Sequence, residues 1–151
     1  MSEENGVLLK PAHILLIEDN PGDVQLAKEA LEESKMYNTL NVVYDGEEAL
    51  NYLFRLGDHK EAQIPDLIIL DLNLPKIDGR EVLRRLKTDK ELKKVPVVIL
   101  TTSKAEEDII QSYEYHANCY VTKPLDLNNF IKVVKTIEDF WMGIVMLPKT
   151  K

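Results

Sequence analysis

The sequence predicts an α/β fold, with one doubly wound, five-stranded parallel sheet and helices on both faces. Five short apolar runs alternate with longer segments whose apolar residues fall at helical spacings. This alternation is typical of parallel sheets joined by right-handed crossover helices. The length, 151 residues, suits one domain of ordinary size.

The apolar runs are the expected strands. Each is short, rich in Ile, Leu and Val, and almost continuous, which is the pattern of strands buried on both faces. In chain order the runs are His13–Glu18, Leu40–Tyr44, Asp66–Leu70, Val95–Leu100 and Asn118–Val121.

The segments that follow the strands carry the helical spacing. The last helix is the clearest, because its apolar residues line one face; they are Phe130, Val133, Val134, Ile137, Phe140 and Trp141. Asp45-Gly46, Asp78-Gly79 and Asp126 supply start or turn chemistry before helical stretches.

We expect the domain to span residues 11–142, with an N-terminal extension over 1–10 and a C-terminal tail over 143–151. The apolar segment Met142–Leu147 follows the last helical face. We expect it to pack back on the domain; the alternative is an association surface.

Charge and cysteine content narrow the function classes. Acidic side chains outnumber basic ones, 26 against 19, and the net charge is −7. Because this sign repels phosphate backbones and anionic lipid, we expect neither nucleic-acid nor membrane binding. The single Cys119 allows no internal disulfide, and no apolar run is long enough for a transmembrane helix or signal peptide. We therefore expect a soluble, cytoplasmic protein.

Acidic residues fall at the ends of two expected strands. Glu18 and Asp19 end the first strand, and Asp71 ends the third. In doubly wound sheets, ligands bind outside the carboxyl ends of the strands, so adjacent first and third strands would bring these carboxylates together. Unit charges 4 Å apart repel by about 4 kcal/mol at an effective dielectric near 20. Either one carboxylate is protonated or a dication lies among them, and hard oxygen ligands suit Mg²⁺.

Two more strand ends complete the set. Thr101 ends the fourth strand and Lys123 ends the fifth. A hydroxyl and an ammonium facing the same crevice could hold the oxygens of a phosphoryl group, and phosphoryl transfer depends chiefly on positioning and charge neutralisation. Pro124 follows Lys123, and a cis bond there would fix the direction of the lysine.

With these residues in place, the chain resembles the receiver domain of two-component response regulators over about Pro11–Trp141. The resemblance rests on Glu18-Asp19, Asp71, Thr101 and Lys123-Pro124 at their strand ends. It implies a flavodoxin-like fold with strand order 2-1-3-4-5. It also implies a signalling domain rather than an enzyme, with slow self-dephosphorylation at most.

The resemblance assigns a role to each site residue. Asp71 accepts a phosphoryl group from the phosphohistidine of a sensor kinase. Asp19, Asp71 and the backbone carbonyl of Asn73 ligate Mg²⁺, with Glu18 acting partly through water. Lys123 pairs with the phosphoryl group and Thr101 swings to hydrogen-bond it. The switch residue Tyr120 moves inward with Thr101, and the surface of the fourth helix, fifth strand and fifth helix rearranges.

A narrower resemblance is to the single-domain regulators paired with bacterial phytochromes. It rests on residues 71–75 and 78–83, His116–Lys123 and Asp139–Pro148. It implies a phytochrome-type kinase as partner, and a homodimer through the fourth helix, the fifth strand, the fifth helix and the C-terminal segment. Thr102 stands where receivers commonly carry Ala or Gly, so its bulk is expected to restrict access to the phosphoryl site.

Two other functions stay open at this point. A haloacid-dehalogenase-type phosphatase also uses a strand-end aspartyl nucleophile with Mg²⁺. It carries a second Asp as general acid, however, and Asn73 in that position cannot deliver a proton. A structural interaction module, whose acids merely cap helices, is the other. The histidines His13, His59 and His116 lack ligand spacing, and we expect them to be structural.

Overall fold

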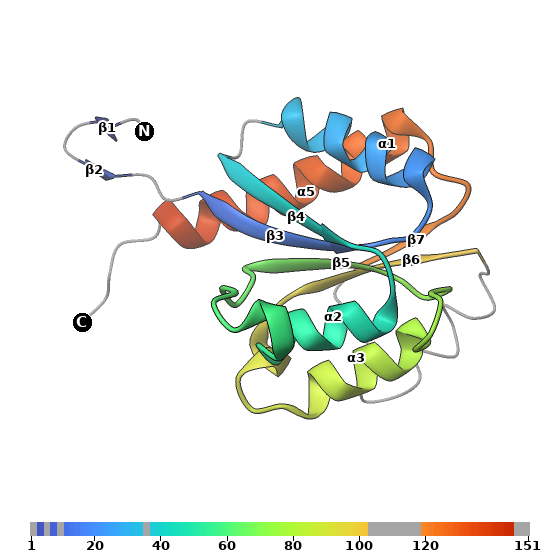
Figure 1. The fold of residues 1–151 in the computed structure, drawn as a ribbon. Coiled ribbons are helices and arrows are strands. Elements are labelled where there is room, and N and C mark those ends of the chain that lie inside the picture. The colour runs from blue at the N-terminus through green and yellow to red at the C-terminus, as the bar shows by residue number, and fades with distance from the viewer. Residues whose placement is uncertain (1–2, 5–6, 9–10, 35–36, 103–118, 147–151) are drawn as a thin grey trace.

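The computed structural model describes residues 3–4, 7–8, 11–34, 37–102 and 119–146 (Figure 1). Its centre is a parallel sheet of five strands in the order β4-β3-β5-β6-β7. The strands are β3 (Ala12–Ile17), β4 (Asn38–Val43), β5 (Leu67–Asp71), β6 (Val97–Thr101) and β7 (Cys119–Thr122). Counted without the two N-terminal strands, this is the predicted order 2-1-3-4-5. The flavodoxin-like fold class is therefore confirmed.

Helices cover both faces of the sheet. Helices α1 (Pro21–Glu32) and α5 (Leu127–Met146) lie on one face, and α2 (Gly46–Leu53) and α3 (Gly79–Thr88) lie on the other (Figure 1). Alternate residues of β3 supply the two cores: Ile14 and Leu16 pack toward α1 and α5, whereas Leu15 and Ile17 pack toward α2 and α3. Two short 3-10 helices, η1 (Gly57–His59) and η2 (Leu92–Lys94), complete the described elements.

The helices begin where the sequence predicts. The side chain of Asp45 accepts a hydrogen bond from the backbone N–H of Glu48 at the start of α2, and Asp78 accepts one from the N–H of Arg80 at the start of α3. Asp126 accepts one from the N–H of Asn128 before α5. A side-chain oxygen at this position satisfies one of the free N–H groups of the first turn.

Some boundaries differ from the predictions. Helix α5 continues to Met146, so residues 143–146 of the expected tail are helical, and the domain limits themselves remain a prediction. Strands β1 (Glu3–Glu4) and β2 (Val7–Leu8) pair antiparallel within the expected N-terminal extension. Two-residue strands carry no periodic signal, so the sequence did not predict them. The expected fourth helix and His116 lie outside the described residues.

The amino end of β3 is fixed by polar contacts. The backbone N–H of His13 donates to Asp66 Oδ2 at 2.8 Å, and His13 Nε2 lies 2.8 Å from the hydroxyl of Tyr52. His13 is buried, and its ring stacks on that of Tyr52. The structural role expected of this histidine agrees with these contacts. Within the described ranges, no helix has both the length and the apolar character needed to cross a membrane.

Candidate functional site

The carboxyl ends of four adjacent strands meet at one edge of the sheet. Ile17 of β3 pairs with Leu70 of β5, and Asp71 pairs with Leu100 of β6. The backbone N–H of Lys123 then donates to the carbonyl of Thr101 at 2.7 Å, which aligns the end of β7 with that of β6. Because β3 and β5 are adjacent while their helices α1 and α3 lie on opposite faces, this edge is the switch point at which such sheets bind ligands.

Three carboxylates converge there. Glu18, Asp19 and Asp71 each offer an oxygen, and these oxygens lie within 4.8 Å of one another. Glu18 and Asp71 are almost completely buried, whereas Asp19 is exposed and faces solvent. The convergence predicted from the strand ends is therefore present.

Lys123 supplies positive charge to this cluster. Its Nζ lies 3.0 Å from Glu18 Oε1, 3.0 Å from Asp23 Oδ2 and 3.2 Å from Asp71 Oδ2. Burial lowers the pKa of the ammonium, but its hydrogen bonds to Glu18 and Asp23 and the charge of Asp71 outweigh burial and raise the pKa above its usual value. Lys123 is thus a permanent cation at physiological pH.

One ammonium does not neutralise the cluster. The pKa of Glu18 is raised from 4.5 to about 7: burial is the main cause and the neighbouring Asp71 adds to it, while the hydrogen bond from Lys123 opposes the increase. Glu18 Oε1 is buried and has no hydrogen-bond partner among the described residues, although it lies within ion-pair distance of Lys123. Three carboxylates around one ammonium leave an excess of negative charge, which fits a divalent cation with hard oxygen ligands.

The loop after β5 borders the site. The backbone N–H of Asn73 donates to Asp71 Oδ1 at 3.0 Å, and the side-chain amide of Asn73 donates to Thr102 Oγ1 at 3.5 Å. Asn73 and Thr102 are both exposed. The contact between them joins the β5 and β6 loops beside Asp71, where Thr102 was expected to restrict access.

The first turn of helix α2 contacts the loop after β5. The backbone N–H of Gly46 donates to the carbonyl of Pro75 at 3.2 Å, and Lys76 Nζ lies 3.6 Å from Asp45 Oδ2. A Cβ atom at Gly46 would overlap the backbone carbonyl of Ile77. Glycine is therefore required here by the close approach of the loop.

The remaining predicted residues flank the cluster. Thr101 is fully buried at the end of β6. Tyr120 is half-buried on β7 and packs against the core on the side of α2 and α3. The Lys123–Pro124 peptide bond is cis. The structure thus places the predicted site residues at or beside the same sheet edge except Tyr120, which pairs with Ile99 two residues before the end of β7. Their individual roles remain predictions.

Asp23 was not predicted and contacts Lys123 as closely as Glu18 does. Asn20 caps α1 and Pro21 is the first residue of that helix. Asp23 therefore lies in the first helical turn, four residues after Asp19 of the carboxylate cluster. The Asn-Pro helix start is the sequence signal that could have placed it there.

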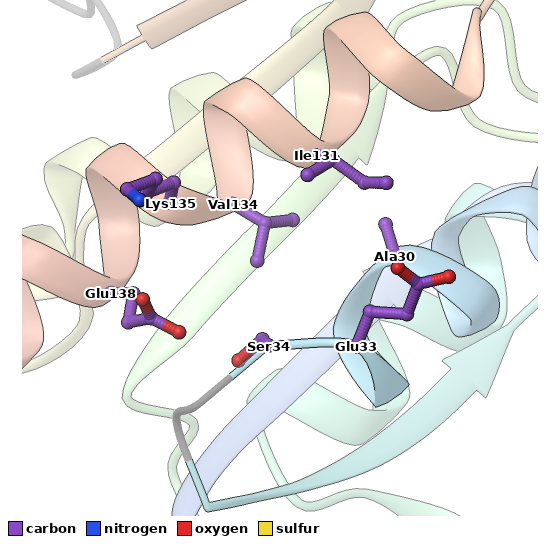
Figure 2. A pocket seen from close by; sticks show the side chains of 7 residues that line it. All are labelled: Ala30, Glu33, Ser34, Ile131, Val134, Lys135 and Glu138. Atoms are coloured by element: carbon purple, nitrogen blue, oxygen red, sulfur yellow. The ribbon is translucent and has the colours of Figure 1, made fainter.

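A separate cavity of about 150 Å³ lies between α1 and α5 (Figure 2). It is lined by Ala30, Glu33, Ser34, Ile131, Val134, Lys135 and Glu138. Its α1 residues come from the last turn of that helix and the residues after it, at the opposite end from Asp23. It is therefore separate from the carboxylate cluster.

Comparison with known proteins gives a consistent result. Residues 14–135 match the family described as the response regulator receiver domain. The chain is 46% identical over 148 residues to the response regulator Rcp1 of Synechocystis sp., covering 98% of this chain and 99% of that protein.

Solved structures agree with this sequence match. The phosphorylated cyanobacterial phytochrome response regulator RcpA is similar with a TM-score of 0.79 and 48% identity, covering 93% of this chain and 100% of RcpA. The Mn²⁺-bound form of Rcp1 is similar with a TM-score of 0.77 and 47% identity, covering 92% of this chain and 100% of that one.

Proposed function

The chain belongs to the response regulator receiver domain family, and from this premise we propose that it is a single-domain response regulator phosphorylated on Asp71 by a sensor histidine kinase. Receiver domains are signalling modules that partner with such kinases. The observation that carries the proposal is the position of Asp71, which is buried in a carboxylate cluster and 3.2 Å from the Lys123 ammonium.

The chemistry is the transfer of one phosphoryl group. A carboxylate oxygen of Asp71 forms a bond to phosphorus, the bond from phosphorus to the histidine nitrogen breaks, and the nitrogen keeps the electron pair and takes a proton from solvent. Lys123 holds the phosphoryl oxygens through its charge, which is preorganised because neighbouring carboxylates already fix the ammonium. Positioning and charge neutralisation are what this reaction requires.

We assign the cofactor as Mg²⁺, held by Asp19, Asp71 and the backbone carbonyl of Asn73, with Glu18 acting partly through water. The convergence of three carboxylates, whose charge the single Lys123 ammonium does not neutralise, supports a divalent cation at this position. Bound there, the cation would neutralise charge on the transferring phosphoryl oxygens. The Mn²⁺-bound structure of the relative Rcp1 is consistent with this assignment.

Phosphorylation at the site is transmitted to the protein surface by a change in side-chain packing. Phosphorylation adds about −1.5 to −2 charges, and this negative charge attracts Lys123 and the hydroxyl of Thr101. Thr102 restricts access to the phosphoryl group, and Pro124 fixes the direction of Lys123. Tyr120 moves inward as Thr101 does. The output surface then comprises β7, α5 and the helix expected between β6 and β7. The phosphoryl group must bind the two packings with different affinity to shift their populations.

The similar proteins indicate which partners to expect. Similarity to Rcp1 and to the phytochrome response regulator RcpA supports a phytochrome-type kinase in the cytoplasm as the donor. We also propose that the protein forms a homodimer through the output surface and the C-terminal end of α5. Sedimentation at micromolar concentration tests this, and a concentration-independent monomer in both phosphorylation states would contradict it.

The test of the phosphorylation site uses Asp71→Asn. With Mg²⁺ and acetyl phosphate, we expect the wild type to gain one phosphoryl group by intact mass, and the variant to gain none. Asp58→Asn changes an exposed aspartate in η1 and is the matched control, which retains the adduct. An adduct that persists in Asp71→Asn would overturn the assignment.

A further inference from the structure

Asp23 contacts the site from a different element than the other acids. It lies in the first turn of α1, and its Oδ2 is 3.0 Å from Lys123 Nζ. The side chain of Lys123 is 12% exposed and that of Asp23 is 20% exposed, so this ion pair is largely shielded from water. Shielding makes it stronger than an ordinary surface pair.

The three acids around Lys123 differ in what else they can bind. Glu18 and Asp71 belong to the carboxylate group that fits a divalent cation, and Asp23 does not. Oxygens that Glu18 and Asp71 turn toward a cation, or that carry a phosphoryl group, are no longer free to hold the ammonium. Asp23 alone among these three keeps its carboxylate available. An ammonium has three N–H donors, so one bond to Asp23 leaves two for the phosphoryl group.

We propose that Asp23 is a positioning residue for Lys123, holding the ammonium toward Asp71 while Glu18 and Asp71 bind a cation and the phosphoryl group arrives. The reaction in this statement is that of the proposed function, on which the inference rests. Asp23 touches neither the reacting oxygen of Asp71 nor the incoming group in this assignment. It acts through Lys123.

The ordinary role of an acid in the first turn of a helix is to interact with the helix dipole. Asp23 also takes part in the helix start, since its N–H donates to the side chain of Asn20. A dipole role alone does not require a partner from another element, yet Lys123 follows β7 and reaches Asp23 across the sheet edge. The experiment must therefore distinguish two roles of Asp23: interaction with the dipole of α1, and positioning of the Lys123 ammonium.

The first measurement is kinetic. Phosphorylation of the full chain is followed at saturating Mg²⁺ over a range of acetyl phosphate concentrations. For Asp23→Asn we expect the saturating rate to fall about tenfold, the lower end of the effect of removing a group that orients a site residue. The donor concentration at half-saturation is expected not to rise, because the variant removes negative charge that repels an anionic donor. Asp23→Glu keeps the carboxylate and is expected to restore much of the rate.

The matched control is Glu81→Gln. Glu81 lies in the first turn of α3 and pairs with Arg84, so it removes a first-turn charge without touching Lys123. We expect its saturating rate to equal that of the wild type. An equal fall in Glu81→Gln and Asp23→Asn would overturn the proposal in favour of a helix role.

The second measurement needs no phosphorylation. A lysine ammonium held by carboxylates exchanges its protons slowly and gives a ¹H–¹⁵N signal, which Lys123→Gln identifies by its loss. We expect this signal to broaden in Asp23→Asn and to persist in Glu81→Gln. An unchanged signal in Asp23→Asn, or an unchanged saturating rate, would overturn the proposal. If the wild type takes up no phosphoryl group, the proposed function fails, and the ammonium signal alone decides whether Asp23 holds Lys123.

Discussion

Glu18 is the residue whose ionisation the site alters most clearly. It is fully buried, and burial raises its pKa from 4.5 to about 7 in the metal-free protein. Between these two values the folded chain binds more protons at Glu18 than the unfolded chain does. The contribution of Glu18 to the free energy of unfolding is therefore largest at low pH and decreases as the pH rises toward 7.

We expect this decrease to be visible as a difference between the wild type and Glu18→Gln. Without divalent cations, the free energy of unfolding of the wild type should fall relative to that of Glu18→Gln by on the order of 3 kcal/mol between pH 4.5 and 7, and remain constant above. Urea unfolding in the presence of a chelator, repeated across this range, measures the difference. A difference that is constant with pH would contradict the raised pKa of Glu18.

At the scale of elements, the contact between α2 and the loop after β5 determines where Asn73 lies. The loop approaches so closely that Gly46 has no space for a side chain, and the N–H of Gly46 bonds to the carbonyl of Pro75. The amide N–H of Asn73 bonds in turn to Asp71. The start of α2 is thereby connected to the cation site through backbone contacts.

Gly46→Ala is expected to force the loop away from α2. We expect a loss of about 1–3 kcal/mol in the free energy of unfolding, as for an inserted methyl group in a packed region, together with weaker binding of Mg²⁺. The control is Glu47→Ala, the next residue of α2, which is exposed and contacts the loop through a surface ion pair with Lys76 at 3.5 Å; because exposed ion pairs contribute little, we expect it to change stability by no more than about 0.5 kcal/mol and to leave the backbone approach intact. Denaturant titration and calorimetry measure the two effects. Wild-type Mg²⁺ affinity in Gly46→Ala would show that α2 does not position the loop.

The elements themselves were largely predictable. Continuous apolar runs predicted the five parallel strands, although the edge strands β4 and β7 are only partly buried and not buried on both faces as expected. The aspartates before α2, α3 and α5 mark helix starts by chemistry that is local. The end of α5 was not predictable in this way. Gly143 is a poor helix former, and yet the helix continues through it to Met146; helix propensity is only a weak preference.

At the scale of the whole molecule, the proposed cation site would make stability depend on the cation that binds there. The buried acids Glu18 and Asp71 and the exposed Asp19 repel one another in the metal-free state, and a cation that binds only the folded chain stabilises it by mass action. At a Mg²⁺ concentration about 100 times the dissociation constant, the gain is about 2.7 kcal/mol.

We expect such a gain to raise the melting temperature by about 5–10 °C for a domain of this size. Thermal unfolding with Mg²⁺ and with a chelator measures the increase. Asp71→Asn removes one carboxylate ligand and is expected to lose most of it, whereas Asp58→Asn retains it. No increase in the wild type, or an equal increase in Asp71→Asn, would contradict the cation assignment.

The convergence of the site could also be predicted from the sequence, because the ends of adjacent parallel strands meet at one edge. The contact of Asp23 with Lys123 could not. It depends on the rotational phase of α1 relative to the sheet and on the path of a lysine side chain that starts at a distant strand. The 3.0 Å ion pair between Glu18 Oε1 and Lys123 Nζ likewise depends on side-chain geometry that no residue pattern encodes.

The burial of β3 on both faces has a consequence for the fidelity of folding. All six residues from Ala12 to Ile17 are buried, and all but His13 are apolar, so the apolar residues alone discriminate weakly between the correct alignment and a shift by one position. The polar residues at its two ends distinguish the correct alignment: His13 with Tyr52 and Asp66, and Glu18 with Lys123. A misaligned strand would carry Glu18 away from Asp71 and Lys123 and leave the carboxylate cluster incomplete.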